Sequence, residues 1–406
     1  MEKMVERFIK YVKVNTQSKE DSETFPSTSN QLILANMVAS DLKEIGLNPY
    51  VSEFGYVYAL IPKNVQGDFP SVGFLAHLDT SPEVSSESIS PKIIRNYNGE
   101  DIELNEEEHI ILSPTKFPHL KEYIGHDLIV TNGKTLLGAD DKAGVVEIIE
   151  AIDEVLHSNV KHGDIYICFT PDEEIGRGVD KIDLERFKPN FAFTLDGEGL
   201  GVFEFENFNA ASLKYTINGI NTHPGSAKNA MKNSIKIATE VISLFPQLES
   251  PEATTNYEGF FHFYEIEGSV EKTKIKAIIR DHDRNRFARR KILAENIANF
   301  INDKYGEGTI KIDLHDQYYN MREVIEKHPE ILEITKKAFE KVEVEFKTRP
   351  IRGGTDGARL TYMGIPTPNI FSGGSNYHSV YEFASVQAME KSRDVIKQII
   401  RLIVEN

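Results

Sequence analysis

The chain has 406 residues, 40% hydrophobic and 27% charged, which is typical of a globular protein of two or three domains. Its formal net charge of -17 and pI near 5.3 argue against binding to nucleic acids or anionic membranes, because both require a basic surface. The single cysteine, Cys168, lies in an apolar run, so no disulfide can form within the chain and a reducing compartment is expected.

The N-terminal stretch has the pattern of an amphipathic helix, with apolar side chains at Met4, Val5, Phe8, Ile9 and Val12. It lacks the continuous apolar centre of a signal peptide. No run approaches the roughly 18 apolar residues that cross a membrane. We therefore expect a cytoplasmic protein.

Helix and strand patterns alternate through the first half of the chain. Helical periodicity runs to a stop at Gly46, and a second helix follows a pair of aspartates at Asp140 and Asp141. Short strands are expected at 57–62, 71–79, 164–171 and 191–198. Residues 81–134 lack helical periodicity, and we expect them to form a β-rich segment. The alternation indicates an α/β fold, with a central, mostly parallel or mixed sheet flanked by helices.

Residues 211–319 follow a different order, strand, helix, strand, strand, helix, strand. In this segment we expect helices at 226–245 and 284–306. A βαββαβ order is typical of a compact, ferredoxin-like α+β domain. After this segment, helix and strand patterns alternate again, as they do in the first half of the chain. We therefore predict a discontinuous main domain, 1–210 and 320–406, interrupted by an inserted domain, 211–319.

Polar side chains that can bind metals follow several of the predicted strands. His77 and Asp79 point to one face at the end of a strand, where the carboxylate can hold the imidazole ring. Adjacent Glu173 and Glu174 cannot both point the same way from an extended segment, so one is suited to bind a metal and the other to face a reacting water. Each feature alone is more often structural or solvated.

Five such residues considered together favour a metal site over separate structural roles, because all lie at the ends of predicted strands of one domain. They are His77, Asp140, Glu174, Asp196 and His378. Two imidazoles and three carboxylates suit zinc or a similar divalent ion, and a shared carboxylate would serve two ions. The sequence contains no GxSxG, Walker A or GxGxxG motif, so nucleophilic or nucleotide-dependent chemistry fits less well.

Seven motifs occur in order along essentially the whole chain: AHLDTSP, LLGADDKAG, FTPDEEIGRG, TLDGE, NTHPGSAKNAMKNS, RGGTDGARL and GGSNYH. On these motifs the chain resembles the peptidase T family of tripeptide aminopeptidases. That family belongs to the di-zinc exopeptidases, with glutamate carboxypeptidase and acetylornithine deacetylase. The resemblance implies metal-dependent hydrolysis of the N-terminal residue of tripeptides by a metal-bridging water that Glu173 activates. It also implies two zinc ions per chain, replaceable by cobalt or manganese.

The resemblance assigns roles to the clustered residues. His77, Asp140 and Asp196 would bind one zinc, Glu174 and His378 would complete the second site, and Asp140 would bridge them. Glu173 would be the general base and Asp79 would orient His77. The family also leads us to expect a cis peptide bond between Asp140 and Asp141, a costly feature for non-proline residues.

The resemblance also implies residues that contact the substrate. In the inserted domain, expected to act as a lid and dimerisation domain, His223 would stabilise the oxyanion. Arg280 and Arg352 would hold the C-terminal carboxylate of the peptide. Asn376 is a further candidate for substrate contact. Many relatives continue after the last histidine with Gly-Lys where this chain has Ser379 and Val380, so contacts at that edge are expected to differ.

Two alternatives stay open. The same metal centre could serve an N-acyl amino acid deacylase or a dipeptidase. A noncatalytic metal-binding or scaffold protein would require the loss of the base or of a ligand, and Glu173 and all five candidate ligands are present. Small peptides are the expected partners, and a homodimer through the inserted domain is the expected assembly.

Overall fold

The computed structural model describes residues 2–405, which divide into two compact units. The larger unit comprises the described residues of Met1–Phe205, Glu323–Arg349 and Thr355–Asn406. The smaller unit comprises Glu206–Arg322 and the short segment Pro350–Gly354. The chain therefore leaves the larger unit and returns to it.

The larger unit is built on an eight-stranded sheet with the order β1-β2-β8-β3-β9-β16-β10-β15. The inner strands β8, β3, β9 and β16 pair in parallel, and antiparallel pairs flank them, so the sheet is mixed as predicted. The strands are β1 (Tyr50–Val51), β2 (Val57–Ile61), β3 (Val72–His77), β8 (Ile165–Thr170), β9 (Phe191–Gly197), β10 (Val202–Glu204), β15 (Lys347–Thr348) and β16 (Asn369–Phe371).

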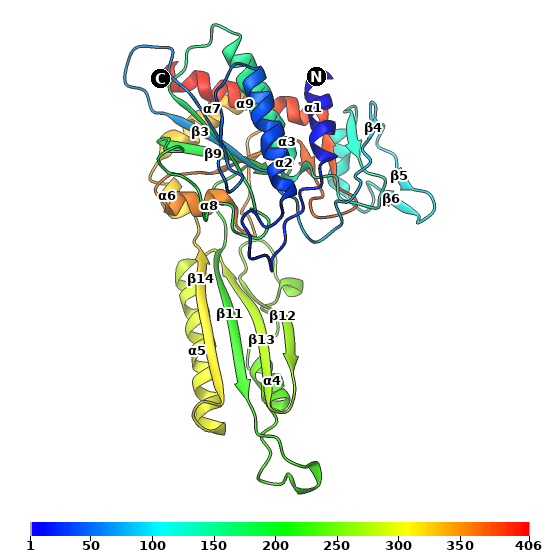
Figure 1. Ribbon diagram of the computed structural model, residues 1–406, viewed down its shortest axis with the longest axis vertical. Helices are drawn as coiled ribbons and strands as arrows, with labels where there is room; N and C mark the ends of the chain where they lie inside the picture. Colours follow the sequence, from blue (N-terminus) through cyan, green and yellow to red (C-terminus); the bar gives the residue numbers. More distant parts are fainter. Residues whose placement is uncertain (1, 406) are drawn as a thin grey trace. The chain divides into compact units, whose positions relative to one another are not determined.

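Alternating side chains of the inner strands pack into two different cores, as the period of two along a strand requires. In β3, Val72, Phe74 and Ala76 join the core that buries side chains of five helices, and Leu75 joins a second cluster with residues of α8 (Asp356–Tyr362). Figure 1 shows the five helices around the strands: α1 (Glu2–Val12), α2 (Asn30–Glu44), α3 (Ala139–Leu156), α7 (Pro329–Lys341) and α9 (Val386–Glu405). Cys168 is buried in the second cluster, where the apolar run predicted it.

The segment expected to be β-rich forms small sheets. A four-stranded sheet has the order β17-β18-β7-β4, and β5 and β6 form a two-stranded one. The elements are β4 (Lys92–Ile94), β5 (Ile102–Asn105), β6 (Ile110–Leu112), η1 (Pro118–Tyr123), β7 (Leu128–Val130), β17 (Gly374–Ser375) and β18 (Phe383–Ser385). A short helix, α6 (Arg322–Ile325), precedes α7.

The smaller unit has the predicted βαββαβ order and a fully antiparallel sheet, β12-β13-β11-β14, which confirms the ferredoxin-like arrangement. Its core is separate and includes Tyr215, Ile279 and Phe287. The elements are β11 (Asn209–Asn218), η2 (Pro224–Ser226), α4 (Ser234–Ser243), η3 (Pro251–Ala253), β12 (Phe260–Gly268), β13 (Lys272–Asp281), α5 (Arg284–Tyr305) and β14 (Ile310–Tyr318).

The predicted start of the first helix in this unit was wrong. We expected a helix at 226–245, but α4 begins only at Ser234. Asn233 caps it, since its side-chain oxygen accepts hydrogen bonds from the N–H groups of Ile235 and Lys236. Asn229 has a φ of 62°, a left-handed conformation that a continuous helix does not contain.

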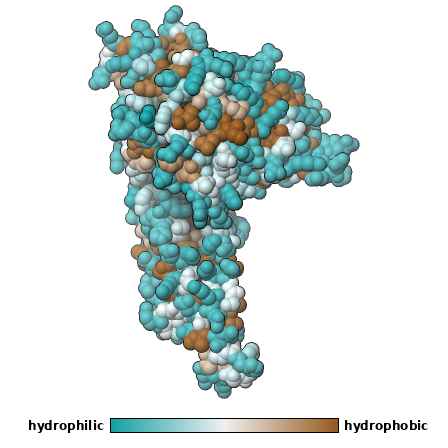
Figure 2. All heavy atoms as spheres, in the orientation of Figure 1, coloured by the Kyte–Doolittle hydropathy of each residue, from teal (hydrophilic) through white to brown (hydrophobic). Residues whose placement is uncertain are grey.

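The surface agrees with the composition. The face drawn in Figure 2 is largely hydrophilic, with small groups of hydrophobic side chains among the polar ones, as expected for a formal net charge of -17. Within residues 2–405, none of the helices combines the length and the apolar character that a bilayer-crossing segment needs.

Candidate metal centre

The candidate ligands meet because three of the strands that carry them are parallel neighbours, β8-β3-β9. The carboxyl ends of parallel strands lie at one edge of a sheet, and ligands bind there in open α/β sheets. His77 ends β3 and lies opposite Thr170, the last residue of β8. Asp196 is the next-to-last residue of β9.

Asp140 lies between two imidazoles. Its Oδ1 is 2.8 Å from Nε2 of His77, and its Oδ2 is 3.2 Å from Nε2 of His378. Oε2 of Glu174 is 2.9 Å from the same His378 nitrogen, and Oδ1 of Asp196 is 3.9 Å from Nε2 of His77. The structure thus brings together all five predicted ligands, with Asp140 facing both histidines.

Two groups of donors have the spacing of a metal site. One ligand atom from each of His77, Asp140 and Glu174 lies within 4.8 Å of the others, and the same holds for His77, Glu173 and Asp196. The second group contains Glu173, to which the resemblance assigned the role of general base. That carboxylate therefore lies among the candidate ligands.

The turn that carries Asp140 is irregular. The N-cap of α3, Gly138, has a φ of 79°, and both Asp140 and Asp141 have non-helical backbone angles. The peptide bond between these aspartates is cis, as the resemblance implied. The Oδ2 of Asp141 accepts a hydrogen bond from the backbone N–H of His77, which ties the turn to the end of β3.

Asp79 connects His77 to the acidic loop after β8. Its buried carboxylate accepts hydrogen bonds from the backbone N–H groups of Glu173 (2.9 Å) and Glu174 (3.1 Å). Nδ1 of His77 is 3.0 Å from the carbonyl oxygen of Asp79 and 3.5 Å from its carboxylate. Asp79 therefore fixes the positions of both neighbouring acids as well as the imidazole ring.

Glu173 is partly buried, and its Oε1 accepts a hydrogen bond from the N–H of Asp356. Burial raises the pKa of Glu173 well above its usual range; the nearby imidazole of His77 opposes this and Asp356 reinforces it. A carboxylate with a raised pKa is better suited to accept and return a proton near neutral pH.

Asp172, which the sequence left without a role, has a structural one. Its carboxylate accepts hydrogen bonds from the N–H and the hydroxyl of Ser27 and from Nε2 of Gln31, at 2.7 Å for both nitrogens. Its own N–H donates to Oε1 of Gln31. Asp172 thus anchors the acidic loop to the segment that leads into α2.

The charges of the cluster favour a cation. Burial, followed by the charge of Asp140, raises the pKa of Glu174 to about 7. Burial opposes the protonation of His378, but Asp140 and Glu174 raise its pKa to about 11. Oε1 of Glu174 is buried and has no hydrogen-bond partner among the described residues. Oxygen and imidazole donors crowded at one buried point fit divalent ions such as zinc.

The remaining predicted residues are divided between the two units. His223, Arg280 and Arg352 belong to the smaller unit. His223 is exposed and its Nδ1 accepts from the N–H of Gly225; Arg280 donates to the side chain of Gln317. Asn376 lies in the loop of His378, in the larger unit. Its amide donates to the carbonyl oxygen of Tyr381.

Arg352 is already engaged within its own unit. Its guanidinium donates to the carbonyl oxygens of Asn256 and Glu258 and to the hydroxyl of Thr254. The arginine therefore holds the loop that precedes β12, and these bonds compete with any contact to a substrate carboxylate.

Sequence reasoning missed two acids of the site. Asp356, in the RGGTDG motif, lies against Gly178 of the motif FTPDEEIGRG, where a side chain at Gly178 would collide with the carboxylate. Glu382 is buried and accepts hydrogen bonds from the turn that carries Asp140. The motif around Asp356 could have pointed to it, whereas no pattern marks Glu382.

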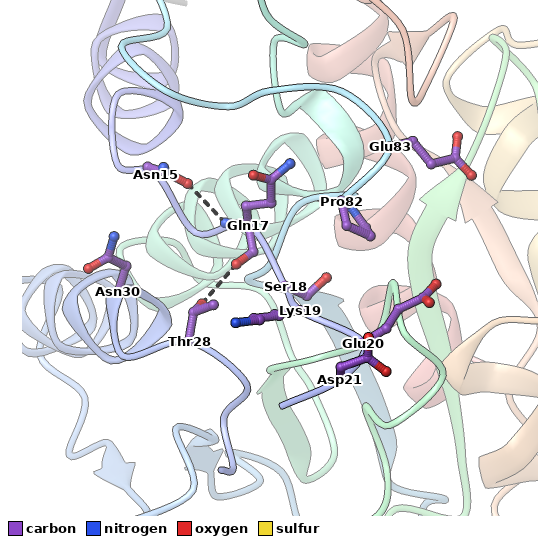
Figure 3. A pocket seen from close by; sticks show the side chains of 10 residues that line it. All are labelled: Asn15, Gln17, Ser18, Lys19, Glu20, Asp21, Thr28, Asn30, Pro82 and Glu83. Atoms are coloured by element: carbon purple, nitrogen blue, oxygen red, sulfur yellow. Dashed lines mark hydrogen bonds between the residues drawn. The ribbon is translucent and has the colours of Figure 1, made fainter. Parts of the chain in front are cut away.

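One residue that lines a pocket near α2 also approaches a candidate ligand. The pocket has a volume of about 590 Å³ and is lined by residues of the segments 15–21, 28–30 and 82–83. Figure 3 shows the carboxylates of Glu20, Asp21 and Glu83 on the same side of this pocket. Oε2 of Glu83 is 3.5 Å from Nδ1 of His378, so the acidic side of the pocket reaches a candidate ligand.

Residues 131–402 match the model of peptidase family M20/M25/M40. The chain belongs to this peptidase family. This M20 peptidase is 54% identical over 404 residues to peptidase T of Halothermothrix orenii, with 99% of each chain covered. The resemblance found in the sequence is thereby confirmed.

Solved structures show that this M20 chain shares its fold with other members of the family. The crystal structure of aminopeptidase PepT from Bacillus cereus matches with a TM-score of 0.76 and 22% identity, over 99% of this chain and 98% of that one. YXEP of Bacillus subtilis, described as a dinuclear metal binding peptidase of the M20 family, matches with a TM-score of 0.64 and 14% identity, over 100% and 99% of the two chains.

Proposed function

We propose that the chain is a metal-dependent aminopeptidase that removes the N-terminal residue of tripeptides. The observation that carries the proposal is the convergence of His77, Asp140, Glu174, Asp196 and His378 at one edge of the sheet, beside Glu173. Full-length similarity to proteins named peptidase T supports the choice of substrate. A structural neighbour described as a dinuclear metal binding peptidase supports two ions per chain. We propose zinc for both, with cobalt or manganese as substitutes, because imidazole and carboxylate donors suit these ions.

The pocket is lined by three acids and one lysine, Lys19, and this excess of acids favours an aminopeptidase over an N-acyl amino acid deacylase. A free peptide N-terminus carries a positive charge at neutral pH, whereas an acylated amine carries none. Glu83 approaches His378, and Glu20 and Asp21 lie on the same side of the pocket. Such an arrangement attracts an ammonium group toward the metal centre.

Different residues of the chain would carry out different steps of the hydrolysis. Divalent ions held by the five ligands would lower the pKa of a bound water to near neutrality. Glu173, held by the N–H of Asp356, takes up the proton from the attacking water and returns it to the leaving amine. Asp79 keeps Glu173 and Glu174 side by side through their backbone N–H groups. His223 is proposed to stabilise the developing oxyanion.

Arginines of the smaller unit would select peptides of three residues by binding the C-terminal carboxylate of the substrate. Arg280 is the stronger candidate for binding the C-terminal carboxylate of the peptide. Arg352 is the weaker one, because three of its hydrogen bonds already go to the loop of Thr254. A planar guanidinium can bind a carboxylate through two parallel hydrogen bonds. Asn376 is proposed to contact the substrate beside His378.

The proposal is tested by metal analysis together with a substrate series. Purified protein loaded with zinc is given alanine peptides of two to five residues, an N-acetylated tripeptide and N-acetylalanine, and released alanine is measured. We expect tripeptide hydrolysis to dominate and both acetylated compounds to resist. Faster release of alanine from N-acetylalanine than from the tripeptide would instead establish a deacylase, and absence of all hydrolysis by zinc-loaded protein would reject an enzyme of this type.

A cytoplasmic homodimer formed through the smaller unit remains part of the proposal. Its strand β12 is at the edge of the sheet, and Tyr264 and Ile266 on it are each 53% exposed. Exposed apolar edge strands readily pair with another chain. Sedimentation of the wild type and of Ile266→Lys would test the assembly, because the charged variant should be monomeric if β12 forms the interface.

A further inference from the structure

One buried carboxylate outside the proposed ligand set accepts three backbone hydrogen bonds from the turn before α3. Oε2 of Glu382 receives the N–H groups of Leu137 (2.6 Å) and Gly138 (2.8 Å), and Oε1 receives the N–H of Asp140 (3.0 Å). Glu382 is 1% exposed. Three donors on a single buried carboxylate fix the backbone of the turn with little freedom.

These bonds replace a local cap. The first N–H groups of a helix have no partner within the helix, and the N-cap of α3, Gly138, has no side chain to supply one. Its φ of 79° and the non-helical angles of Asp140 leave the turn without regular helical hydrogen bonding. Glu382 therefore holds a backbone conformation that the local sequence does not stabilise.

The position of Glu382 in the chain links two candidate ligands. It follows His378 by four residues, and its own N–H donates to the carbonyl oxygen of Ser379, so both belong to one tight segment. The same segment thus presents His378 to Oδ2 of Asp140 and holds the backbone of Asp140. A shift of this segment would move both ligands relative to His77.

The charges of the two carboxylates that hold the ligand loops, Glu382 and Asp79, act on a further buried group, Lys142. It is fully buried, and its Nζ donates to the carbonyl oxygen of Val14. Burial lowers the pKa of Lys142 to about 7, while the charges of Glu382 and Asp79 act in the opposite direction.

We propose that Glu382 is a positioning residue of the metal centre, which sets the place of Asp140 relative to His77 and His378 and thereby the affinity for divalent ions. The inference rests on the proposed metal-dependent function. Groups that orient metal ligands typically change metal affinity by about 10- to 100-fold when they are replaced.

The test compares three variants in their binding of Zn²⁺. Glu382→Gln keeps size but places an NH₂ donor against the N–H groups that the carboxylate accepted. Glu382→Asp keeps both acceptors with a shorter reach. The matched control is Glu150→Gln, which removes another buried carboxylate from α3, one that pairs with Arg7 and contacts none of the proposed ligands.

Metal-free protein is titrated with Zn²⁺ in competition with a chelator of known affinity, and kcat and KM for a tripeptide are measured at saturating Zn²⁺. We expect Glu382→Gln to bind Zn²⁺ about 10- to 100-fold more weakly, with a lower kcat and KM within about twofold of the wild type. Glu382→Asp should recover part of the affinity, and Glu150→Gln should lower thermal stability with unchanged affinity.

Other results would overturn the inference. Zn²⁺ affinity of Glu382→Gln within twofold of the wild type, or an equal loss in Glu150→Gln, would assign Glu382 to general stability. If Glu382→Gln does not fold, Glu382→Asp decides, and wild-type affinity in that variant rejects the positioning role. A wild-type protein that binds no Zn²⁺ would reject the proposed function itself, which is a separate outcome.

Discussion

Replacing Asp172 by alanine should destabilise the larger unit more than any other single change in the acidic loop. Asp172 is fully buried and accepts hydrogen bonds from the N–H and hydroxyl of Ser27 and from Nε2 of Gln31. Ser27 and Gln31 are themselves buried. Alanine would leave the N–H of Ser27 without an acceptor, and Nε2 of Gln31 would keep only the hydroxyl oxygens of Ser27 and Thr28, both at 3.3 Å.

The magnitude follows from the number of donors. A buried donor left unpaired costs about 1 to 3 kcal/mol. The serine hydroxyl can rotate toward another acceptor, so the N–H of Ser27 counts fully and the NH₂ group of Gln31 counts in part. Asp172 has a φ of 56°, where alanine costs roughly 1 kcal/mol more than residues that tolerate the left-handed region. Removal of a buried carboxylate returns part of its desolvation cost. The expected loss is therefore about 3 kcal/mol.

Urea unfolding followed by circular dichroism measures this loss, and Asp172→Asn and Asp180→Ala accompany the alanine variant. Asparagine tolerates the left-handed conformation and keeps one acceptor, so its loss should be about half as large. Asp180 is a partly exposed acid of the same loop region that pairs with Arg359, and its removal should cost less than about 1 kcal/mol. Equal midpoints for Asp172→Ala and Asp180→Ala would refute the reasoning.

Four further predictions use other parts of the chain. Glu173→Gln should lower kcat for tripeptides by about 100- to 10,000-fold with an unchanged metal content by elemental analysis, and activity within tenfold of the wild type would exclude Glu173 as the base. Excess chelator should abolish activity and added Zn²⁺ should restore it; activity that persists in chelator contradicts metal dependence. Arg280→Ala should raise KM for tripeptides at least tenfold, whereas unchanged kinetics would remove Arg280 from the substrate site. Burial lowers the pKa of His282 to about 4. As the pH falls, the imidazole is therefore protonated first in the unfolded chain, near pH 6.5. The free energy of unfolding should fall by up to roughly 3 kcal/mol between about pH 6.5 and about pH 4. His282→Phe should lose this acid sensitivity in pH-dependent urea unfolding, and a parallel acid dependence in both proteins would count against it.

The parts of the fold that depend on local patterns could be predicted from the sequence. The alternation in β3 that sends Phe74 to one core and Leu75 to the other is a direct consequence of the strand period. Because β8, β3 and β9 are parallel, acids that follow these strands had to converge, and the predicted ligands do so. The βαββαβ order of the smaller unit could likewise be predicted from the spacing of its apolar residues.

Features that depend on contacts between distant segments could not be predicted. The start of α4 was missed for a local reason: the helix pattern from Ser226 onward continues without a break in composition, and only the cap at Asn233 and the left-handed Asn229 show where the helix begins. Glu382 resembles any polar residue at the start of a short strand. Its role exists only because the turn of Asp140 lies beside it, 242 positions earlier in the chain.

Six of the acids in and around the site separate into two kinds by the partners they have. Asp79, Asp172 and Glu382 each accept at least two hydrogen bonds from backbone or side-chain N–H groups, so their charge is satisfied by the protein and they position the loops. Asp140, Glu174 and Asp196 face imidazoles and one another, with a buried oxygen of Glu174 unpaired among the described residues. The first kind needs no cation and the second kind does. Neutralising an acid of the first kind should therefore move the metal site, whereas neutralising one of the second kind should remove a ligand from it.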